Sequence, residues 1–497
     1  MQPHRYLLVF ILGLFVASCT KTPTDPKADT KIPPQEVVVD LDFDKIKARG
    51  HLIAIMDNSS TGLFLYKGQT MGYEYELLKM FADSIGLELR INLESNLEKA
   101  FKLLNEGAGD VLAYNLTVTK ERKKRIAFTH YHNLVKQVLI QRKPDNWRQM
   151  KLHEIEKTLI RNPVDLIGKE VYVRYHSAYL HRLRNLSDEI GGDIIIIEDF
   201  PNMETEMIIK KVVNGDIEYT VAEEDIALVN ATYYPILDIN TAVSFPQQIS
   251  WGVRKNADSL LVLMNNWIRQ MKKTPDYYTV YNRYFKNSRA SKQRNRSEYS
   301  TMGGGKISPF DEFLKESAEV LGWDWRLLAA QVFKESKFDP DAISWAGAIG
   351  LLQVLPKTGE SYGYTDLKTP RTNLAAATEH LKWLQSMWEK EIENPEERQK
   401  FVLASYNVGH GHVFDAIRLA EKYEGNPKEW ESVSSFLLKK EDPEYFNDEV
   451  VRFGYCRGSE PVRYVKVIYA TYDNYLKLYP DEVSESTDLQ SSLKTTP

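Results

Sequence analysis

The chain has 497 residues, a length that allows two to four domains at about 100–200 residues per domain. Hydrophobic residues make up 43% of the chain and charged residues 27%, a globular composition that excludes a mostly disordered protein. Lys and Arg number 64 against 69 Asp and Glu, and the net charge of −5 gives no support to a nucleic-acid partner bound through bulk positive charge. The two cysteines, Cys19 and Cys456, are too few for a disulfide framework or a four-cysteine zinc site.

The N-terminal residues predict secretion. Arg5 precedes an apolar run from Tyr6 to Ala17, which is too short for a spanning helix and is typical of a signal peptide over residues 1–18. Small residues come directly before Cys19, and this pattern resembles the lipobox of bacterial lipoproteins. The resemblance implies cleavage before Cys19 and acyl chains on that residue. The alternative is a cysteine that happens to lie at a signal cleavage site.

Residues 19–44 are predicted to be a lipidated tether, because residues 20–40 are rich in Lys, Thr, Pro and Asp. Two or more acyl chains anchor a protein stably in a membrane. No Asp follows the cysteine, which in the sorting rule of Gram-negative lipoproteins resembles an outer-membrane address. We therefore expect a partner in the outer-membrane lipid and a location on its periplasmic face. No other stretch of the sequence is long and apolar enough to cross a bilayer.

Residues 45–288 alternate between short apolar strands and amphipathic helices. A strand is predicted at Leu52–Met56, a helix at Tyr73–Ile85 that Gly86 ends, and a half-buried strand at Leu87–Leu93. This alternation predicts an α/β fold with mostly parallel sheets. The further predicted strands are Val111–Tyr114, Val135–Ile140, Val171–Val173, Ile194–Ile197, Tyr219–Ala222 and Ser250–Val253.

The same region resembles the family 3 extracellular solute-binding domains, which are two-lobed, periplasmic-binding-protein-like clamshells for amino acids. The resemblance rests on Gly107-x-x-Asp110, on Thr117-Val-Thr-Lys-Glu-Arg122 and on Ile126-Ala-Phe-Thr-His. It implies that Arg122 and Thr117 hold the α-carboxylate of a ligand. A guanidinium suits this role because it can donate two parallel, charged hydrogen bonds to a carboxylate. The alternative is a solvated arginine within a surface run of charges.

The resemblance also places two ligand contacts in the second lobe. Ser177 matches a serine in the family's glycine-containing turn, and Glu223 matches the acidic residue that binds the ligand amine. His176 stands where the family has glycine, and the three acids at 223–225 leave the register of the match open. The expected ligand is an amino acid or a murein peptide.

Residues 289–305 are predicted to be a linker. Five basic residues and no acid lie between residues 286 and 296, and three glycines follow at 303–305. Such a composition cannot bury a core, which predicts a solvated hinge. Its positive charge could also contact an anionic polymer.

From residue 306 to residue 480 the pattern is helical. Ser308 and Pro309 predict the start of a helix and Gly322 its end. No strand pattern interrupts the region, so an all-α domain is predicted, followed by a polar tail at 481–497. The other predicted helices are Trp325–Ser336, Thr372–Glu393, Glu396–Tyr406, His412–Lys422 and Val462–Leu478.

Four motifs follow one another in this helical region. They are Glu335-Ser336, Gly347-Ala-Ile-Gly350-Leu-Leu-Gln353, Ala404-Ser-Tyr406-Asn407-Val-Gly409 and Gly458-Ser-Glu460-Pro-Val-Arg-Tyr464. The pair Asn373-Leu stands between the second and the third. Their order resembles that of the lytic transglycosylase domain of the soluble-transglycosylase type, which is lysozyme-like. Together with the lipobox and the receptor-like region, the set resembles the architecture of membrane-bound lytic transglycosylases.

Glu335 is the predicted catalytic residue. Leu328 and Val332 precede it by seven and three positions, so that all three share one face of a helix. Apolar neighbours desolvate a carboxyl group and raise its pKa, and a general acid must keep its proton near neutral pH.

The resemblance adds substrate-binding residues around this acid. Gln353 offers both a donor and an acceptor, and Tyr406 can hydrogen-bond the catalytic carboxyl or a substrate hydroxyl. Helix packing and capping remain the alternative for Tyr406 and Asn407. Glu460 either assists a positively charged transition state or holds the last helix through a salt bridge. The full set is Ser336, Gln353, Tyr406, Asn407 and Glu460.

The resemblance implies non-hydrolytic cleavage of the β-1,4 bond between N-acetylmuramic acid and N-acetylglucosamine in peptidoglycan glycan strands, leaving a 1,6-anhydro end. It also leads us to expect that a ligand in the clamshell regulates the enzyme. One alternative is a murein-binding receptor, against which the intact Glu335-Ser336 pair argues. The other is a lysozyme-type hydrolase, for which Glu360, Asp366 or Glu460 could supply the second carboxylate.

No cofactor and no metal are expected. The sequence contains no His-Glu-x-x-His motif of a zinc peptidase. The pairs His130–His132 and His410–His412 could each contribute two ligands, but no clear acidic or cysteine partner accompanies either pair.

Overall fold

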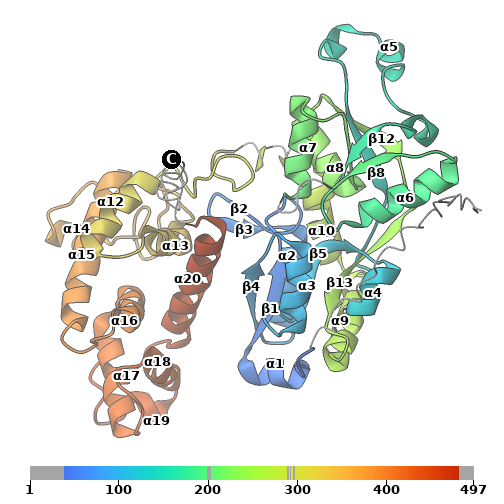
Figure 1. Ribbon diagram of the computed structural model, residues 1–497. Helices are drawn as coiled ribbons and strands as arrows, with labels where there is room; N and C mark the ends of the chain where they lie inside the picture. Colours follow the sequence, from blue (N-terminus) through green and yellow to red (C-terminus); the bar gives the residue numbers. More distant parts are fainter. Residues whose placement is uncertain (1–37, 199–202, 288–289, 292, 295–296, 481–497) are drawn as a thin grey trace, which may run out of the picture. The chain divides into compact units, whose positions relative to one another are not determined.

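The computed structural model describes residues 38–198, 203–287, 290–291, 293–294 and 297–480 (Figure 1). The predicted signal peptide, Cys19 and the predicted tail at 481–497 lie outside the described residues, as does most of the predicted tether. Among the residues described, no helix has both the length and the apolar composition needed to span a membrane.

The first lobe is built on a sheet with the strand order β4-β1-β5-β13-β6, and β7 also pairs with β13. Its central strand, β5 (Val111–Thr117), is buried along its whole length. Ala113 packs with helices α2 (Tyr73–Ser84) and α9 (Asp258–Met271) on one face, and Leu112 packs with α3 (Leu97–Asn105) on the other. The remaining elements are α1 (Phe43–Arg49), β1 (His51–Met56), β2 (Phe64–Tyr66), β3 (Gln69–Met71), β4 (Glu88–Leu93), α4 (Lys120–Arg125), β6 (Ala127–Phe128), β7 (Asn133–Val135), β13 (Gln247–Val253), α10 (Pro275–Tyr281) and η3 (Asn282–Lys286).

The second lobe has the strand order β10-β9-β11-β8-β12. Leu139 and Ile140 are neighbours on β8 (Gln137–Arg142) and therefore point to opposite faces, where they join two separate apolar clusters. One cluster includes residues of α6 (Ala178–Ile190) and the other residues of α7 (Thr205–Asn214). The remaining elements are η1 (Trp147–Gln149), α5 (Leu152–Glu156), η2 (Pro163–Leu166), β9 (Glu170–Tyr172), β10 (Ile195–Ile197), β11 (Tyr219–Glu223), α8 (Glu224–Tyr233) and β12 (Leu237–Ala242).

The two lobes form the predicted α/β clamshell, but the sheets are mixed. The strands β1, β4 and β5 are parallel, whereas β13 is antiparallel to β5; likewise β8 is antiparallel to β11. The prediction of mostly parallel sheets is therefore wrong. The chain leaves the first sheet after β7 to enter the second as β8, and it returns from β12 to enter the first as β13. Neither β8 nor β13 therefore enters its sheet through a βαβ crossover, the connection that makes neighbouring strands parallel.

The predicted linker bonds to the first lobe. The Lys67 N–H donates to the carbonyl of Tyr299 at 2.7 Å, and the Thr301 N–H donates to the carbonyl of Leu65 at 3.1 Å. Ser300 between them is buried. The prediction of a solvated hinge is wrong for residues 299–301, because a polar segment can bond to a strand through its backbone without burying apolar side chains.

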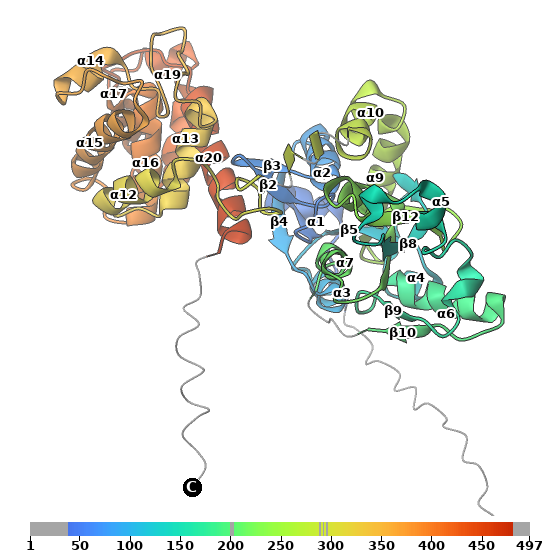
Figure 2. The ribbon, with the colours of Figure 1, turned by 90° about the horizontal axis from the view of Figure 1, so that it is seen from above.

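The C-terminal region is helical as predicted, and Figure 2 shows α12–α20 gathered into one group of helices. Several of these helices begin at a proline, whose fixed φ suits the first helical position and whose missing N–H loses no bond there. The helices are α12 (Asp311–Leu321), α13 (Trp325–Ser336), α14 (Pro356–Ser361), α15 (Pro370–Trp388), α16 (Pro395–Val408), α17 (His410–Lys422), α18 (Trp430–Lys439), α19 (Pro443–Phe446) and α20 (Ser459–Leu478).

Several helix ends differ from the prediction, and two of them show why. The first helix begins at Asp311 rather than Pro309, because the Asp311 carboxylate accepts hydrogen bonds from the N–H groups of Ile307 and Ser308 and holds the preceding residues in a turn. Helix α15 ends at Trp388, well before the predicted end at 393; Ile392, which suggested a longer helix, is buried from within a turn.

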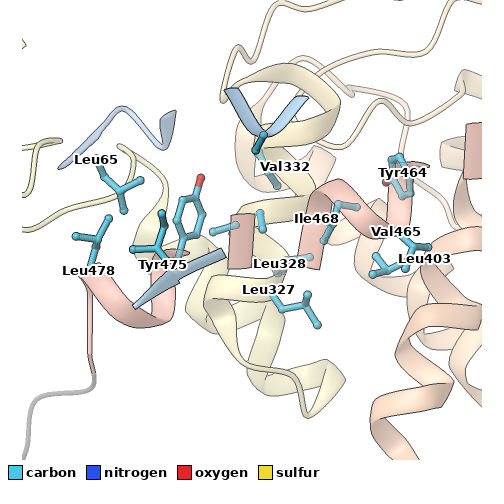
Figure 3. Packing of buried hydrophobic residues seen from close by; sticks show 14 of the residues in the cluster. Leu65, Leu327, Leu328, Val332, Leu403, Tyr464, Val465, Ile468, Tyr475 and Leu478 are labelled. Atoms are coloured by element: carbon cyan, nitrogen blue, oxygen red, sulfur yellow. The ribbon is translucent and has the colours of Figure 1, made fainter. Parts of the chain in front are cut away.

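The centre of this region is the packing of α13 against α20 and of α20 against α16. Leu328 and Val332 of α13 lie in one apolar cluster with Ile468 of α20 and Leu403 of α16 (Figure 3). All four side chains are fully buried, and each contributes about 1.5–3 kcal/mol through the apolar area that it removes from water. This packing fixes the end of α13, which carries Glu335.

Candidate active site and ligand-binding cleft

Glu335 lies in the last turn of α13, which ends where Lys337 and Phe338 adopt positive φ values of 54° and 62°. Its carboxyl group accepts a hydrogen bond from the hydroxyl of Tyr464, with 2.6 Å between the phenolic oxygen and Oε1. Burial raises the pKa of Glu335 above its ordinary value, while the Tyr464 hydrogen bond and the charge of Lys334 act in the opposite direction. The arrangement favours a carboxyl that holds a proton yet can release it.

Tyr464 is a site residue to which sequence reasoning gave no role, although it stands in the last of the four motifs. It lies in the second turn of α20 and is 1% exposed. The side-chain amide of Gln331, one helical turn before Glu335, donates to the Tyr464 hydroxyl at 3.3 Å. Because 129 residues separate Tyr464 from Glu335, no periodicity within either helix could have predicted the contact.

Tyr406 lies near the catalytic carboxyl but does not bond to it. Its hydroxyl donates to the carbonyl oxygen of Leu352 at 2.7 Å. Burial, and then the negative charge of Glu335, raises the Tyr406 pKa. The hydrogen bond to Glu335 that was predicted as one option for Tyr406 is made by Tyr464 instead.

The segment from Ala342 to Val354 forms a tight loop beside these tyrosines, and Gln353 is folded into it. Gln353 has a positive φ of 49°, and its amide donates to the carbonyls of Ala342 and Gly350 at 3.1 and 2.9 Å. Both contacts are within the loop, so the Gln353 amide braces the loop in this structure. Its predicted contact with substrate requires the amide to exchange these partners.

Asn373 of α15 fastens the same loop. Its side-chain oxygen accepts from the Leu352 N–H at 2.9 Å, and its amide donates to the carbonyls of Ile349 and Leu367 at 2.8 and 2.9 Å. Gly350 is required at this point: its φ is 78°, and a Cβ there would come within 2.5 Å of the Asn373 amide nitrogen. Sequence reasoning quoted Asn373 in the motif region without giving it a role.

The other predicted substrate contacts differ in their surroundings. The Ser336 hydroxyl is buried and donates to the Val332 carbonyl of its own helix at 3.3 Å. Asn407 and Glu460 line a cavity of about 450 Å³ together with Tyr464. Glu460 is exposed and has no ion-pair partner among the residues described, which removes the salt-bridge alternative proposed for it.

Asp366, one of the carboxylates that a hydrolase could have used, has a structural role. It accepts a hydrogen bond from the Thr369 hydroxyl at 2.6 Å and another from the Lys368 N–H at 3.3 Å. Both donors lie directly before α15, so this side chain holds the turn that leads into the helix. Glu360 is exposed on α14.

In the clamshell, Arg122, Ser177 and Glu223 line one cavity of about 40 Å³. The Thr117 hydroxyl of the first lobe donates to Glu223 of the second lobe at 3.2 Å, and Arg122 donates to the Thr117 carbonyl at 2.9 Å. The structure therefore brings the four predicted ligand contacts together. A cavity of this size holds about one water molecule, so an amino acid can enter only if the surrounding groups move apart.

Three further charged residues line the cavity and were missed by sequence reasoning. Arg174 of the second lobe pairs with Asp57 of the first lobe at 3.1 Å, and Glu206 accepts from the Ser60 N–H across the lobes at 3.0 Å. Asp57 directly follows β1 and Arg174 comes two residues after β9. Ligands of α/β sheets commonly bind beyond the carboxyl ends of the strands, and that position was the available signal for both residues.

His176 stands where the family has glycine. Its φ is 54°, in the left-handed region that favours glycine. The turn therefore keeps the backbone geometry of a glycine turn at some strain. The neighbouring Ser177 hydroxyl is buried and has no hydrogen-bond partner among the described residues. It lines the cavity and can bond to a ligand there.

Burial also changes the ionisation of the cleft. It raises the pKa of Glu223 to about 8 and lowers that of Arg122 to about 10. Asp225 adds to the rise at Glu223, while Arg122 opposes it. A cationic group entering the cleft would favour the charged form of Glu223.

The two histidines of each predicted pair lie in different surroundings. His132 is buried beside Glu74, with 3.5 Å between Nε2 and Oε2, whereas His130 is exposed. His410 contacts the ring of Trp383, and His412 lies 3.1 Å from the Lys440 amine. Within the described residues, no group of three His, Cys, Asp or Glu side chains could hold a metal ion.

Comparison with known proteins gives two domain matches. Residues 53–287 match the bacterial extracellular solute-binding proteins, family 3. Residues 312–428 match the transglycosylase SLT domain. The chain also matches the crystal structure of an ancestral arginine-binding protein bound to arginine, at 21% identity and a TM-score of 0.39, over 48% of this chain and 99% of that one.

Curated relatives extend the match over both regions. The membrane-bound lytic murein transglycosylase F of Desulfosudis oleivorans is 32% identical over 430 residues, which cover 86% of this chain and 90% of the relative. The protein of the same name from Stutzerimonas stutzeri is 28% identical over 474 residues, 94% of this chain and 90% of the relative. Since the first match joins 32% identity to nearly full length, the chain belongs to the family of the membrane-bound lytic murein transglycosylase F proteins.

Proposed function

We propose that the protein is a peptidoglycan lytic transglycosylase with an attached ligand-sensing domain. The observation that carries the proposal is Glu335, a half-buried carboxyl group with a raised pKa at the end of α13, within the match to the transglycosylase SLT domain. Tyr464, which bonds to Glu335, lines a cavity of about 450 Å³ that has room for a sugar substituent. The relatives that bear the name of murein transglycosylases indicate the glycan strand as the substrate.

In the proposed reaction, protonated Glu335 donates its proton to the oxygen of the β-1,4 bond between N-acetylmuramic acid and N-acetylglucosamine. The bond from C1 of muramic acid to that oxygen breaks, and the sugar's own acetamido oxygen stabilises the positive charge at C1. The Glu335 carboxylate then takes the proton of the C6 hydroxyl, whose oxygen bonds to C1. One residue acts as acid and then as base, no water is consumed, and the product carries a 1,6-anhydromuramic acid end.

A lysozyme-type hydrolase is the competing reaction, and it needs a second carboxylate to activate water or to form a covalent intermediate. Asp366 is engaged by Lys368 and Thr369 in the turn before α15. Glu460 shares the cavity with Tyr464 and Asn407 and is the carboxylate best placed for a supporting role near the positive charge that develops at C1.

The test is mass spectrometry of purified murein digested by the full-length protein and by a Glu335→Gln variant. We expect the wild type to release 1,6-anhydro ends and the variant to lose at least about 10²–10⁴ of the rate, because an amide can neither donate nor recover the proton. The variant should fold as stably as the wild type at neutral pH, since it removes a carboxyl whose charged form burial disfavours. Reducing ends in the products would favour the hydrolase, and an active Glu335→Gln variant would exclude the mechanism.

We further propose that the clamshell is a sensor for a small ligand with a free carboxylate, an amino acid or a murein peptide. The ligand would be held by Arg122 and Thr117 of one lobe and by Ser177 and Glu223 of the other. Arg122, Ser177 and Glu223 line the same cavity, and Thr117 bonds to Glu223. A ligand regulates the enzyme only through its preference for one conformation, typically about 1–3 kcal/mol of coupling.

Calorimetric titration of amino acids and murein peptides into wild type and Arg122→Ala tests the sensor. Loss of binding in Arg122→Ala, with retention in the exposed neighbour variant Lys123→Ala, is the expected result. Cleavage rates are then measured with and without each binder. A tight binder that needs Arg122 but leaves cleavage unchanged would contradict regulation and leave the enzyme assignment intact.

We also propose that the protein is a lipoprotein of the outer membrane, cleaved after residue 18 and acylated at Cys19. The lipobox-like sequence supports this, and the relatives are named membrane-bound. A Cys19→Ala variant should leave the membrane fraction and appear in the soluble periplasm. Unchanged fractionation with outer membranes would contradict the anchor.

A further inference from the structure

The cavity beside Glu335 is lined mainly by positive charge. We call it the α20 pocket; it has a volume of about 450 Å³, and its walls come from the end of α13, from α16 and from the start of α20. Three of its side chains are cationic and one is a carboxylate, although the chain as a whole has a net charge of −5. The residues that line it are Lys334, Asn407, Arg457, Ser459, Glu460, Arg463, Tyr464 and Val467.

The pocket adjoins the catalytic carboxyl through Tyr464. The hydroxyl of this residue donates to Glu335, and its ring lies 5.3 Å from the amine of Lys334. Lys334 is also next to Glu335 in the chain and near enough in space to lower its pKa. The pocket and the Glu335 carboxyl therefore share Tyr464, which lines the one and bonds to the other.

The three cations have no protein partner of opposite charge. Lys334, Arg457 and Arg463 are exposed, and no ion pair or side-chain hydrogen bond engages them among the residues described. Elsewhere on the same helices cations are paired, as Lys400 is with Glu397 and Lys477 with Asp473. An unpaired cluster that converges on a cavity is available for an anion from outside the protein.

We propose that the α20 pocket binds the carboxylate groups that muramic acid carries next to the bond cleaved at Glu335. This inference rests on the proposed murein-cleaving function. In a peptidoglycan strand only muramic acid bears carboxylates, on its lactyl group or on the stem peptide that extends from it. Guanidinium groups suit them, because each can donate two parallel charged hydrogen bonds.

The volume of the pocket agrees with a substituent larger than one carboxylate. Pockets for small-molecule ligands span about 300–1,000 Å³, and the α20 pocket falls in this range. Glu460 at its wall supplies one negative charge, which would face the free amine of a stem peptide. Both the excess of cations and the single acid match a peptide with more carboxylates than amines.

The experiment compares three substrates: intact murein, murein stripped of stem peptides by an amidase, and murein whose carboxyl groups have been converted to primary amides. The variant is Arg457→Gln with Arg463→Gln, and Lys390→Gln is the control, an exposed lysine outside the pocket. On intact murein we expect KM to rise about three- to tenfold in the double variant with kcat unchanged, and the salt dependence to weaken. Amidation should raise the wild-type KM by a similar factor. It should also abolish the difference in KM between the wild type and the double variant.

Stripped murein identifies the source of the carboxylate. Where a stem peptide is attached, the lactyl carboxyl is an amide, so a defect on intact murein that disappears on stripped murein assigns the stem peptide. A defect that persists on stripped murein shows that the pocket also accepts the lactyl carboxylate, which the amidase exposes. Equal KM values on intact murein, or an equal defect on amidated murein, would overturn the proposal. An Arg457→Lys, Arg463→Lys variant guards against misfolding, since retained charge should restore most of the affinity. Failure of the proposed function is recognised separately, as absence of anhydro ends when the wild type acts on intact murein.

Discussion

At the scale of single residues, the pKa of Glu335, the proposed catalytic residue, is set by a balance between burial and one hydrogen bond. Burial raises the pKa of Glu335, and the Tyr464 hydroxyl lowers it by bonding to the charged form. A single acid that must first donate and then recover a proton needs both influences. With burial alone it would hold the proton too tightly, and with a strong hydrogen bond alone it would lose the proton before catalysis.

The first prediction follows from this balance. In Tyr464→Phe the carboxylate loses its hydrogen bond, so the Glu335 pKa rises further and the alkaline limb of the kcat/KM profile moves to higher pH. The value of kcat should fall, because the carboxyl is no longer oriented. The measurement is the pH dependence of cleavage between pH 4 and pH 9.

Tyr469→Phe is the matched control, since Tyr469 is another tyrosine of α20 and its hydroxyl bonds to Gln399 at 3.3 Å, not to Glu335. Its pH profile should match the wild type. A limb that moves to lower pH in Tyr464→Phe would show that the Tyr464 hydroxyl does not stabilise the carboxylate.

At the scale of elements, the loop from Ala342 to Val354 depends on α15. This loop carries the Leu352 carbonyl to which Tyr406 donates, so its position determines that of Tyr406. Asn373 makes three hydrogen bonds to backbone groups from a side chain that is 0% exposed. Removing it would leave buried N–H and C=O groups without partners.

The second prediction is that Asn373→Ala lowers the free energy of unfolding by about 2–4 kcal/mol, since each buried polar group left unpaired costs about 1–3 kcal/mol. Cleavage should fall in protein that remains folded, because Tyr406 loses its anchor. Urea denaturation and cleavage rates at a temperature well below the transition measure the two effects. Asn447→Ala, at an exposed asparagine, is the control and should change stability by less than about 0.5 kcal/mol. Equal losses in both variants would contradict the special role of Asn373.

At the scale of the whole molecule, the clamshell holds several acids that burial keeps protonated. The pKa values of Glu74, Glu204 and Glu223 are each raised to about 8, against about 4.3 for an unfolded glutamate. Between those values the folded state binds more protons than the unfolded state, so stability falls as pH rises. His132, whose pKa burial lowers to about 3, acts in the opposite direction only below about pH 6.5.

The third prediction is therefore a lower stability of the clamshell at pH 8 than at pH 6.5. Thermal unfolding of the full chain, followed at both values, should show the transition of the clamshell at a lower temperature at pH 8. Glu223→Gln removes one of the three glutamates and should reduce the difference. A transition that moves to higher temperature at pH 8 would mean that these carboxyls are charged in the folded protein.

Several features of this protein were determined by sequence alone. Periodicity located most strands of the two clamshell sheets, though not β6, β7 or β12, and most helices of the C-terminal region, because the spacing of apolar residues along one element reports which face is buried. Helices α14, α18 and α19 were not predicted. The ends of α12 and α15 were misplaced, because turns can bury apolar residues and can hold a capping bond. The motif around Glu335 singled out the acid for the same local reason: Leu328 and Val332 share its face.

The contacts between distant segments were decided by the tertiary structure. Tyr464 meets Glu335 only because α20 packs on α13, and Asp57 meets Arg174 only because two lobes close on each other. Strands β8 and β13 each enter a sheet from the other lobe, and no local pattern in the sequence records that path. Periodicity measures burial within one element, whereas the partners of a buried polar group depend on which elements pack together, and in this protein those elements lie far apart in the chain.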